Sequence, residues 1–343
     1  MVEMTASLVE EENNRTVSVL LSVPPSRLYD YAVPQELKVL PGDIVDIPLG
    51  TRRVLGVVWG PGSRVQPSIK IKPLLGRRPM GGLSAELRRL IDWVGNYYLS
   101  SPGVVLRMVL STPSALQERK PLKGYQDIGS RPVRITPQRA RIFEVLSNRG
   151  PCVLRDIVQS ARVSPGVVKQ LENEGHLAVS YIQLPPDQEP PNPDYRGPQL
   201  SPDQERSARA LRRAVIDCKS GVKLLDGVTG AGKTEVYFEA IAAAIQREGQ
   251  ALILIPEIAL TEDWIRRFQS RFGVRPWAWH SEIGTATRRE TWRQASSSRP
   301  GVFVGTRSAL FLPFQNLGLI IVDEEHDPSY KQEEGVMYNA RDV

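Results

Sequence analysis

The octapeptide GVTGAGKT, residues 227–234, constrains the fold of this chain more than any other segment. It matches G-x-x-x-x-G-K-[ST] at every fixed position, directly follows the apolar VKLLD, and directly precedes EVYFEAIAAAIQ, which favours a helix. In a strand–loop–helix of this kind, backbone N–H groups and the helix N-terminus bind phosphates, the Lys reaches the outer phosphates and the Thr ligates Mg²⁺. A glycine-rich turn by chance is the weaker alternative. The residues expected to bind ATP are Gly227, Val228, Thr229, Gly230, Ala231, Gly232, Lys233 and Thr234.

Residues 201–343 alternate apolar runs with helical stretches. The runs expected to be strands are VKLLDGV (222–228), ALILIPE (251–257), PWAWHS (276–281), GVFVGT (301–306) and LGLIIVDEEH (317–326). Nearly continuous apolar strands separated by helices indicate a parallel sheet with helices on both faces. This part of the chain is therefore expected to be an α/β lobe built around the phosphate loop.

The last of these runs delivers adjacent acids to the carboxyl edge of the sheet, where ligands collect in open α/β folds. Asp323 is expected to hold Mg²⁺ through water, and Glu324 to orient and deprotonate the attacking water. A strand followed by acids is a weak signal alone, but it is strong when paired with the phosphate loop. The expected catalytic residues are Glu324, Asp323 and Lys233.

Other residues of the lobe have two open interpretations. Gln204, in LSPDQERSARAL, can hydrogen-bond adenine or lie on a solvated helix. Thr306, Arg307 and Ser308 follow a strand and suit phosphate contacts along single-stranded DNA, or are ordinary loop residues. Tyr330 and Lys331 can contact a DNA base and backbone near the acids, or pack the lobe.

The first half of the chain is basic. Residues 13–183 hold 24 Lys and Arg against 12 Asp and Glu, whereas residues 184–343 hold 20 against 22. This asymmetry suggests that the first half meets a polyanion, with a solvated basic surface as the alternative. Short apolar runs punctuated by Pro and Gly over residues 13–80 predict a small antiparallel β-module. The spacing of apolar residues then predicts a helix over 84–99, with Ser84 as its N-cap.

The middle of the chain predicts linkers around a small helical domain. The domain prediction is a disordered tail at 1–12, a β-rich domain at 13–112, a linker at 113–130, a winged helix at 131–183, a Pro-rich linker at 184–200 and the P-loop lobe at 201–343. Three short helices, at about 137–147, 153–161 and 164–174, followed by a strand-like tail, favour the winged helix over a generic helical spacer. The third helix carries Lys169 with Glu172 and Glu174 behind it, so strong sequence-specific DNA reading is not expected.

Several classes of function are disfavoured. No apolar run approaches the length that spans a bilayer, and the N-terminus lacks the order of a secretory signal. With only Cys152 and Cys218, neither a disulfide framework nor a Cys-based zinc site is expected. His176 and His280 are interpreted as structural. A cytoplasmic protein without membrane contact is the default expectation.

GVTGAGKTEVY, IPEIALT, GTRSALFLPF and VDEEHDPSYKQEEG, in this order and spacing, resemble the primosomal protein N′ family, the bacterial replication-restart DNA helicases of superfamily two. The resemblance spans nearly the whole chain, and DEEH followed by DPSYKQ is its most specific part. It implies a multidomain α/β protein with a β-rich N-terminal DNA-binding module, a winged helix and a RecA-like P-loop lobe. The implied activity is ATP-dependent 3′-to-5′ unwinding at stalled or repaired forks, with reloading of the replicative helicase.

The resemblance also implies particular ligands and partners. The family's pocket for a DNA 3′ end maps onto Tyr29, Asp30 and Gly50, with Lys70 a looser match. An aromatic under the terminal base and a carboxylate accepting from the 3′-hydroxyl suit such an end. The implied cofactors are ATP and Mg²⁺, the latter at Thr234 and Asp323. The implied partners are forked and single-stranded DNA, primosome loading proteins and single-strand-binding protein.

The resemblance leaves parts of the family's pattern unmatched. The family continues to a further strand of the first lobe, a Cys-rich zinc module and a second RecA-like lobe with arginine fingers. In RecA-like sheets that further strand inserts between the strands of the phosphate loop and of the acids. This chain is therefore expected to bind DNA and ATP without efficient hydrolysis. Two alternatives remain: a DNA-fork adaptor without motor activity, and, with less support, another P-loop translocase.

Overall fold

The computed structural model describes residues 15–23, 27–63, 71–117, 121–182, 189–195, 197–218, 220–256 and 261–343. The expected tail at 1–12, Lys70, residues 184–188 of the expected linker and residues 257–260 of IPEIALT lie outside these ranges. The chain forms two compact units, one of residues 1–117 and 188–343 and one of residues 118–187. Within the described ranges, no helix has the length and apolar character needed to cross a membrane.

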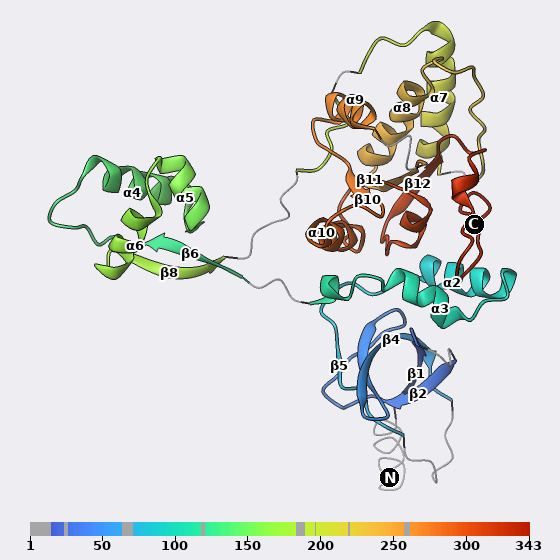
Figure 1. Ribbon diagram of the computed structural model, residues 1–343, viewed down its shortest axis with the longest axis horizontal. Helices are drawn as coiled ribbons and strands as arrows, with labels where there is room; N and C mark the ends of the chain where they lie inside the picture. The colour runs from blue at the N-terminus through green and yellow to red at the C-terminus, as the bar shows by residue number, and fades with distance from the viewer. Residues whose placement is uncertain are drawn as a thin grey trace, which may run out of the picture. The chain divides into compact units, whose positions relative to one another are not determined.

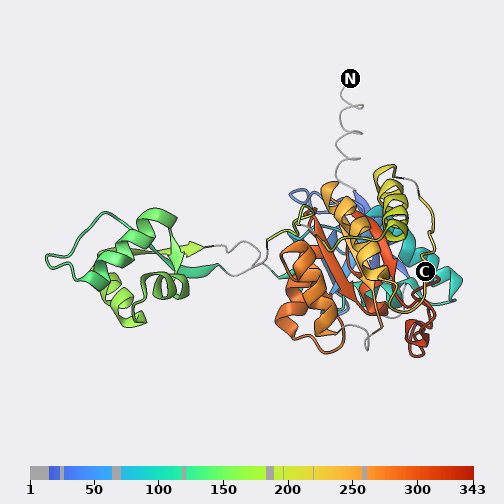
Figure 2. The same ribbon diagram turned by 90° about the horizontal axis from the view of Figure 1, so that it is seen from above.

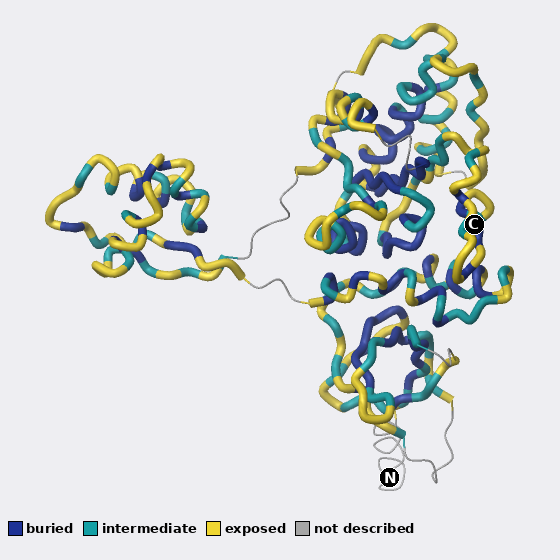
Figure 3. The backbone as a smooth tube through the Cα atoms, in the orientation of Figure 1, coloured by how far each residue is buried: buried dark blue, intermediate teal, exposed yellow. Residues whose placement is uncertain are grey.

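The first unit begins with an antiparallel sheet, which confirms the predicted β-module. Its strand order is β2-β1-β4-β3-β5. Alternate residues of β1, such as Val19 and Leu21, point into a core that also holds Tyr31 and Ile47, while Leu20 points to the opposite face. Figure 3 shows these strands largely in dark blue and teal, as buried or half-buried. The strands are β1 (Thr16–Leu21), β2 (Leu28–Ala32), β3 (Ile44–Leu49), β4 (Arg52–Pro61) and β5 (Gly76–Arg77).

A helical layer follows this sheet. Helix α2 (Ala85–Tyr97) matches the predicted helix, and the Ser84 hydroxyl accepts a hydrogen bond from the Leu87 N–H at 3.2 Å, which confirms the predicted N-cap. Helix α3 (Pro102–Val109) and the short η1 (Pro113–Leu116) come next. Ala115 and Leu116 are buried, so the beginning of the expected linker at 113–130 is part of the packed unit.

The P-loop lobe contains a parallel sheet of order β10-β11-β9-β12, as predicted. Alternate residues of its strands face two cores. Ala251, Ile253 and Val302 pack against α8 and α9, whereas Leu252 and Phe303 pack with α10 and with α2 and α3 (Figure 1). The elements are α7 (Pro202–Ile216), α8 (Lys233–Gln246), β9 (Gln250–Leu254), α9 (Glu262–Phe272), β10 (Trp277–Trp279), α10 (Thr285–Ala295), β11 (Gly301–Gly305), η3 (Arg307–Phe311), β12 (Leu317–Val322) and η4 (Pro328–Tyr330).

The N-terminal helices and the P-loop lobe share one core. The Trp292 indole N–H of α10 donates to the Val109 carbonyl oxygen at 2.9 Å. The Arg293 Nε donates to the Ala115 carbonyl at 2.9 Å, and the Gln315 amide to the Gly82 carbonyl at 2.9 Å. These bonds surround the apolar contact, so the two predicted domains form a single packed unit.

The prediction of a strand immediately before the phosphate loop was wrong. Residues 221–228 are irregular, and Val222 and Leu224 are 97% and 82% exposed. Strand β12 pairs with β9 along one edge, and Ile320 on it is 46% exposed. A strand forms only where a neighbour accepts its hydrogen bonds, and the described residues place no such neighbour beside 222–226.

The second unit, drawn in green in Figures 1 and 2, confirms the three predicted helices and the strand-like tail. Its helices pack around Ile142, Ile157 and Leu171. However, β6 lies inside the segment predicted as a linker, and it pairs with β8, so the domain begins before residue 131. The sequence LKGYQD does not reveal this strand, because only Gly124 and Tyr125 are buried on it and Tyr125 is its only buried large side chain. The elements are β6 (Leu122–Asp127), α4 (Pro137–Arg149), β7 (Cys152–Val153), α5 (Leu154–Ala161), α6 (Pro165–Asn173) and β8 (Leu177–Ile182).

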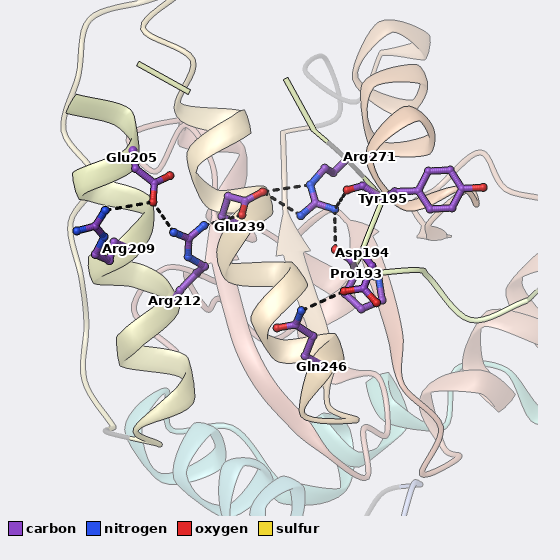
Figure 4. Close-up of polar contacts among 9 residues, drawn as sticks. All are labelled: Pro193, Asp194, Tyr195, Glu205, Arg209, Arg212, Glu239, Gln246 and Arg271. Carbon is purple, nitrogen blue, oxygen red and sulfur yellow. Dashed lines mark hydrogen bonds and ion pairs between the residues drawn. The ribbon is translucent and has the colours of Figure 1, made fainter. Parts of the chain in front are cut away.

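Part of the predicted linker at 184–200 is attached to the P-loop lobe. The buried Arg271 guanidinium of α9 donates to the carbonyl oxygens of Pro193 at 3.0 Å and Tyr195 at 2.7 Å, as Figure 4 shows. The same guanidinium pairs with Glu239 on α8 at 2.9 Å. Glu239 also pairs with Arg212 on α7 at 2.8 Å. Residues 189–195, which were predicted to belong to an interdomain linker, are therefore held by the lobe.

Candidate nucleotide site and DNA-binding surfaces

The phosphate loop precedes helix α8, as predicted. Gly230 and Gly232 have φ of +80° and +77°, a left-handed conformation that glycine adopts without a Cβ penalty. Gly232 is the N-cap of α8, so the first N–H groups of that helix lie next to the loop. The Lys233 ammonium donates to the Gly227 carbonyl oxygen at 2.9 Å, which joins the two ends of the loop. This geometry presents backbone donors and one cation, the groups that bind phosphates.

Gln204 lies against the loop. Its amide N–H donates to the Ala231 carbonyl at 2.8 Å, and its carbonyl oxygen accepts from the Ser201 N–H at 2.8 Å in a capping box. Both ends of the side chain are therefore bonded to protein here. One N–H and one oxygen lone pair of the amide are not used by these bonds, and the proposed role of Gln204 in selecting ATP stays a prediction.

Asp323 lies at the carboxyl end of β12, where the sequence placed it. Its backbone N–H donates to the Leu254 carbonyl oxygen at 2.9 Å, which extends the pairing of β12 with β9. One carboxylate oxygen accepts from the Tyr237 hydroxyl at 2.9 Å, and the other from the Glu324 N–H at 3.0 Å. Sequence reasoning did not single out Tyr237. A signal was present, since Tyr237 follows Thr234 by three residues on a helix and so shares its face.

Thr234 and Asp323 are brought together through that tyrosine. The Tyr237 hydroxyl donates to Asp323 at 2.9 Å, and Thr234 lies one turn before Tyr237 on α8. Residues three apart on a helix have neighbouring side chains, so Thr234 lies on the face of α8 that approaches Asp323. A hydroxyl and a carboxylate are hard oxygen ligands of the kind that Mg²⁺ takes together with nucleotide phosphates. The residues present therefore fit Mg²⁺ bound with ATP.

Glu324 is exposed and has φ of +47°, an uncommon conformation for a residue with a Cβ. Such backbone costs on the order of 1 kcal/mol and is often found at functional sites. The Glu324 carboxylate lies 3.8 Å from the His326 Nε2 atom. The role of Glu324 in activating water stays a prediction.

The two segments predicted to contact DNA lie together in the lobe. An Arg307 guanidinium N–H donates to the Ser329 carbonyl at 2.8 Å and reaches the Lys331 carbonyl at 3.3 Å. Thr306, Arg307 and Ser308 are half-buried, and Lys331 is exposed. Arg307 therefore uses part of its hydrogen-bonding capacity to hold residues 329–331 in place.

Tyr330 packs the lobe, the second of its two alternatives. It is 2% exposed, and its hydroxyl lies within hydrogen-bond distance of the carbonyl oxygens of Leu254 and Asp323. Burial, with the nearby Asp323 charge, raises the pKa of this hydroxyl. A ring covered in this way cannot stack on a base, so the predicted DNA contact of Tyr330 was wrong.

The proposed 3′-end residues lie in the N-terminal sheet. Asp30 on β2 is opposite Ser18 on β1, and the Ser18 hydroxyl donates to Asp30 Oδ1 at 2.5 Å. The Ser63 N–H donates to Asp30 Oδ2 at 3.1 Å. These bonds fix the carboxylate. The Arg27 guanidinium lies 5.1 Å from the centre of the neighbouring Tyr29 ring.

Gly50 lies at the turn between β3 and β4, with φ of +60°. The Lys72 ammonium lies 3.5 Å from the Gly50 carbonyl oxygen, and the Lys72 carbonyl accepts from the Ala32 N–H at the end of β2. Lys72 thus connects the Gly50 turn to the strand of Tyr29 and Asp30. Sequence reasoning selected Lys70, which lies outside the described residues, and did not single out Lys72, two residues further along in KIK.

The predicted recognition helix of the second unit, α6, has its acids paired. Glu172 pairs with Lys123 at 2.7 Å, and the adjoining Glu174 pairs with Arg139 at 2.8 Å. Lys169 is exposed. His176 bonds the Ser130 hydroxyl at 2.9 Å through Nδ1, in keeping with a structural role. No group of three or more potential His, Cys, Asp or Glu metal ligands occurs among the residues that the structure describes.

Comparisons with known proteins match both ends of the chain. Residues 18–111 match the 3′DNA-binding domain (3′BD) family of PriA, and residues 201–342 match the DEAD/DEAH box helicase family. Curated relatives, each called replication restart protein PriA, match over nearly the whole chain. The relative from Rickettsia conorii is 31% identical over 96% of this chain and 40% of its own length.

Other relatives give the same result. The Chlamydia pneumoniae protein is 32% identical over 93% of this chain and 44% of its own length. The Haemophilus influenzae protein is 31% identical over 96% of this chain and 47% of its own length. The chain therefore spans less than half the length of these relatives.

Proposed function

The chain belongs to the PriA family of replication restart proteins, and from this premise we propose that it binds DNA with a free 3′ end and holds Mg²⁺–ATP, as parts of an ATP-dependent 3′-to-5′ DNA helicase. The observation that carries the proposal is the hydrogen bond to Asp323 at 2.9 Å from Tyr237, which lies one turn after Thr234 on the helix that follows the phosphate loop. The same unit contains the sheet of Asp30.

The nucleotide part of the proposal assigns each group a task. The loop from Gly227 to Gly232 and the start of α8 bind the phosphates through N–H groups, and Lys233 leaves the Gly227 carbonyl to reach the outer phosphates. Thr234 and Asp323 hold Mg²⁺, which screens the phosphate charge when bound with ATP. Glu324 orients the attacking water and accepts its proton. Gln204 contacts the base.

The DNA part rests on charge and on fixed polar groups. Asp30 accepts from a 3′-hydroxyl, Tyr29 packs under the terminal base, and Lys72 near Gly50 meets a phosphate. Thr306, Arg307 and Lys331 contact the backbone of a single strand passing over the lobe. Exposed cations of the second unit, such as Lys169, add contacts with duplex DNA without base reading.

We expect hydrolysis by this chain alone to be negligible. The segment before the phosphate loop is irregular, Val222 and Leu224 are exposed, and no described strand pairs beneath the loop, which leaves the loop less well supported for catalysis. Primosome loading proteins, single-strand-binding protein, the zinc module and a place in the bacterial cytoplasm belong to the whole-protein part of the proposal.

The test measures DNA and nucleotide binding by the full chain. Fluorescence anisotropy compares forks that carry an exposed 3′-hydroxyl with forks that carry a blocked 3′ end. Asp30→Ala is expected to remove the preference for the free end, whereas Lys233→Ala leaves DNA binding unchanged and abolishes binding of a fluorescent ATP analogue. Equal affinity of wild type and Asp30→Ala for both forks contradicts the 3′-end assignment.

A non-motor fork adaptor is the second candidate. The exposed Val222 and Leu224 favour it, because a phosphate loop without its supporting strand is less well ordered for nucleotide binding. The two candidates differ in one measurement. Mg²⁺-dependent nucleotide binding that requires Lys233 supports the helicase part, and DNA binding with no nucleotide binding supports the adaptor.

A further inference from the structure

Tyr237 lies at the centre of the nucleotide site without a role in the function proposed above. It is on α8, one turn after Thr234, and its side chain is buried beneath the carboxyl end of β12. Its hydroxyl is 2.9 Å from Asp323 Oδ2 and 2.9 Å from the Trp264 indole nitrogen on α9. Thr234 lies one turn earlier, on the same face of α8. Three elements of the lobe therefore converge on one hydroxyl.

The direction of these hydrogen bonds follows from the chemistry of the partners. A tyrosine hydroxyl has one proton to donate and can accept two hydrogen bonds. The Trp264 indole can only donate, and an ionised Asp323 can only accept. The Tyr237 proton therefore points to Asp323, because a tyrosine hydroxyl is protonated at neutral pH.

This arrangement restricts the orientation of Asp323, one of the two oxygen ligands. The Asp323 carboxylate is held from both sides, by Tyr237 on one oxygen and by the Glu324 N–H on the other. A ligand held in one orientation loses less conformational freedom when it binds.

We propose that Tyr237 is a positioning residue for the Mg²⁺ side of the nucleotide site, which sets the orientation of Asp323 through a single buried O–H group. The inference rests on the nucleotide function proposed above, and it concerns only the hydroxyl. The ring has a separate role, since it packs edge-to-face against Phe238 at a centroid distance of 5.4 Å. Phenylalanine keeps that packing and removes the hydroxyl alone.

The chain offers a matched control for this substitution. Tyr338 is also fully buried, and its hydroxyl has no hydrogen-bond partner among the residues that the structure describes. Tyr338→Phe therefore removes a buried tyrosine hydroxyl that positions nothing at the nucleotide. Any effect of Tyr237→Phe that Tyr338→Phe lacks comes from the partners of Tyr237.

The experiment measures the affinity of the full chain for a fluorescent ATP analogue in Mg²⁺ and in EDTA. We expect Mg²⁺ to tighten binding by wild type and by Tyr338→Phe to the same extent. Tyr237→Phe should lose about fivefold of that Mg²⁺-dependent gain, the equivalent of one net hydrogen bond of about 1 kcal/mol, with binding in EDTA unchanged. Trp264→Phe should lose less, because the Tyr237–Asp323 bond remains.

A double-mutant cycle tests whether the hydroxyl acts through Asp323. Asp323→Asn should abolish most of the Mg²⁺-dependent gain, and Tyr237→Phe should add little to it. Additive losses contradict the inference. So does an equal weakening by Tyr237→Phe in Mg²⁺ and in EDTA, which indicates a purely structural hydroxyl. Far-ultraviolet circular dichroism checks that each variant is folded.

Different results overturn the positioning role of Tyr237 and the nucleotide site on which that role rests. Wild-type binding that depends on Mg²⁺ and Lys233, combined with no effect of Tyr237→Phe, overturns the positioning role alone. Wild-type binding that ignores Mg²⁺ or does not require Lys233 overturns the nucleotide site and the positioning role together.

Discussion

The Arg271 guanidinium pairs with the Glu239 carboxylate at 2.9 Å, and this pair joins the segment before the P-loop lobe to the helix that begins at the phosphate loop. Arg271 also donates to the carbonyl oxygens of Pro193 and Tyr195, and Glu239 continues to Arg212 on α7 (Figure 4). The helix of Gln204 and the helix of Lys233 are thus connected to the chain that leads in from the second unit.

Replacing Arg271 should destabilise the lobe and release that segment. Arg271→Ala leaves Glu239 with one cation and two carbonyls without their donor, and loss of one partner of a buried pair costs about 3 kcal/mol. Urea unfolding followed by tryptophan fluorescence measures the loss. The segment 189–195 should also become sensitive to protease in native buffer.

Arg266→Ala is the matched control on the same helix. Arg266 and its partner Asp263 are both exposed, and such a pair contributes at most about 1 kcal/mol. Similar destabilisation by the two substitutions contradicts the role given to the Arg271 network.

The shared core predicts joint unfolding of the N-terminal domain and the P-loop lobe. Trp292 is fully buried between them and bonds Val109, so Trp292→Ala should cost about 4 kcal/mol and uncouple the two parts. Calorimetry should show one transition for this unit in wild type and two in the variant. The partly exposed Trp93→Ala should leave the single transition intact. Two transitions in wild type contradict a shared core.

The charge of Asp46 should make the stability of the protein depend on pH in the acid range. Burial raises the pKa of this carboxyl, but hydrogen bonds and charge from Arg53 and Arg78 outweigh that effect and hold it below its ordinary value of 3.8. A lowered folded-state pKa gives stability that is present above pH 4 and is lost as the pH falls through the folded-state value. Asp46→Asn should therefore be less stable than wild type by about 2 kcal/mol at pH 7.

Measured from pH 7 to pH 2, the stability gap between wild type and Asp46→Asn should close. The exposed Asp263→Asn serves as the control and should leave the pH profile of wild type unchanged. A gap between wild type and Asp46→Asn that stays constant with pH means that the Arg53 and Arg78 bonds do not control the Asp46 charge.

Sequence patterns predicted the elements whose determinants are local. The Ser84 cap, the apolar runs of β9 and β11, and the phosphate loop each follow from spacing within a few residues. The strand at 222–226 failed because an apolar run does not reveal whether a neighbouring strand will pair with it. Strand β6 was not predicted for the opposite reason. Its sequence is mostly polar, but its backbone still pairs with β8.

The candidate site shows the same division. Lys233, Thr234 and Asp323 were found from motifs, because phosphate and metal chemistry restrict residue type and spacing. The hydroxyl of Tyr237 was missed because α8 is apolar along most of its length, so a tyrosine there is typical of a helix core. Its role depends on Asp323, which lies 86 residues away in the sequence. Contacts over that distance are set by the fold.

The open edge of β12 predicts self-association of a polypeptide that consists of residues 1–343 alone. Ile320 is exposed on a strand that pairs only with β9 in the described part of the chain, and open apolar edges pair with other chains. Ile320→Lys should lower the associated fraction in sedimentation velocity, because a charge on an edge strand opposes pairing. Ile216→Lys is the control, since Ile216 is as exposed but lies at the end of α7, away from any strand. If both lysines reduce association equally, general surface charge is the cause and the β12 edge is not the contact.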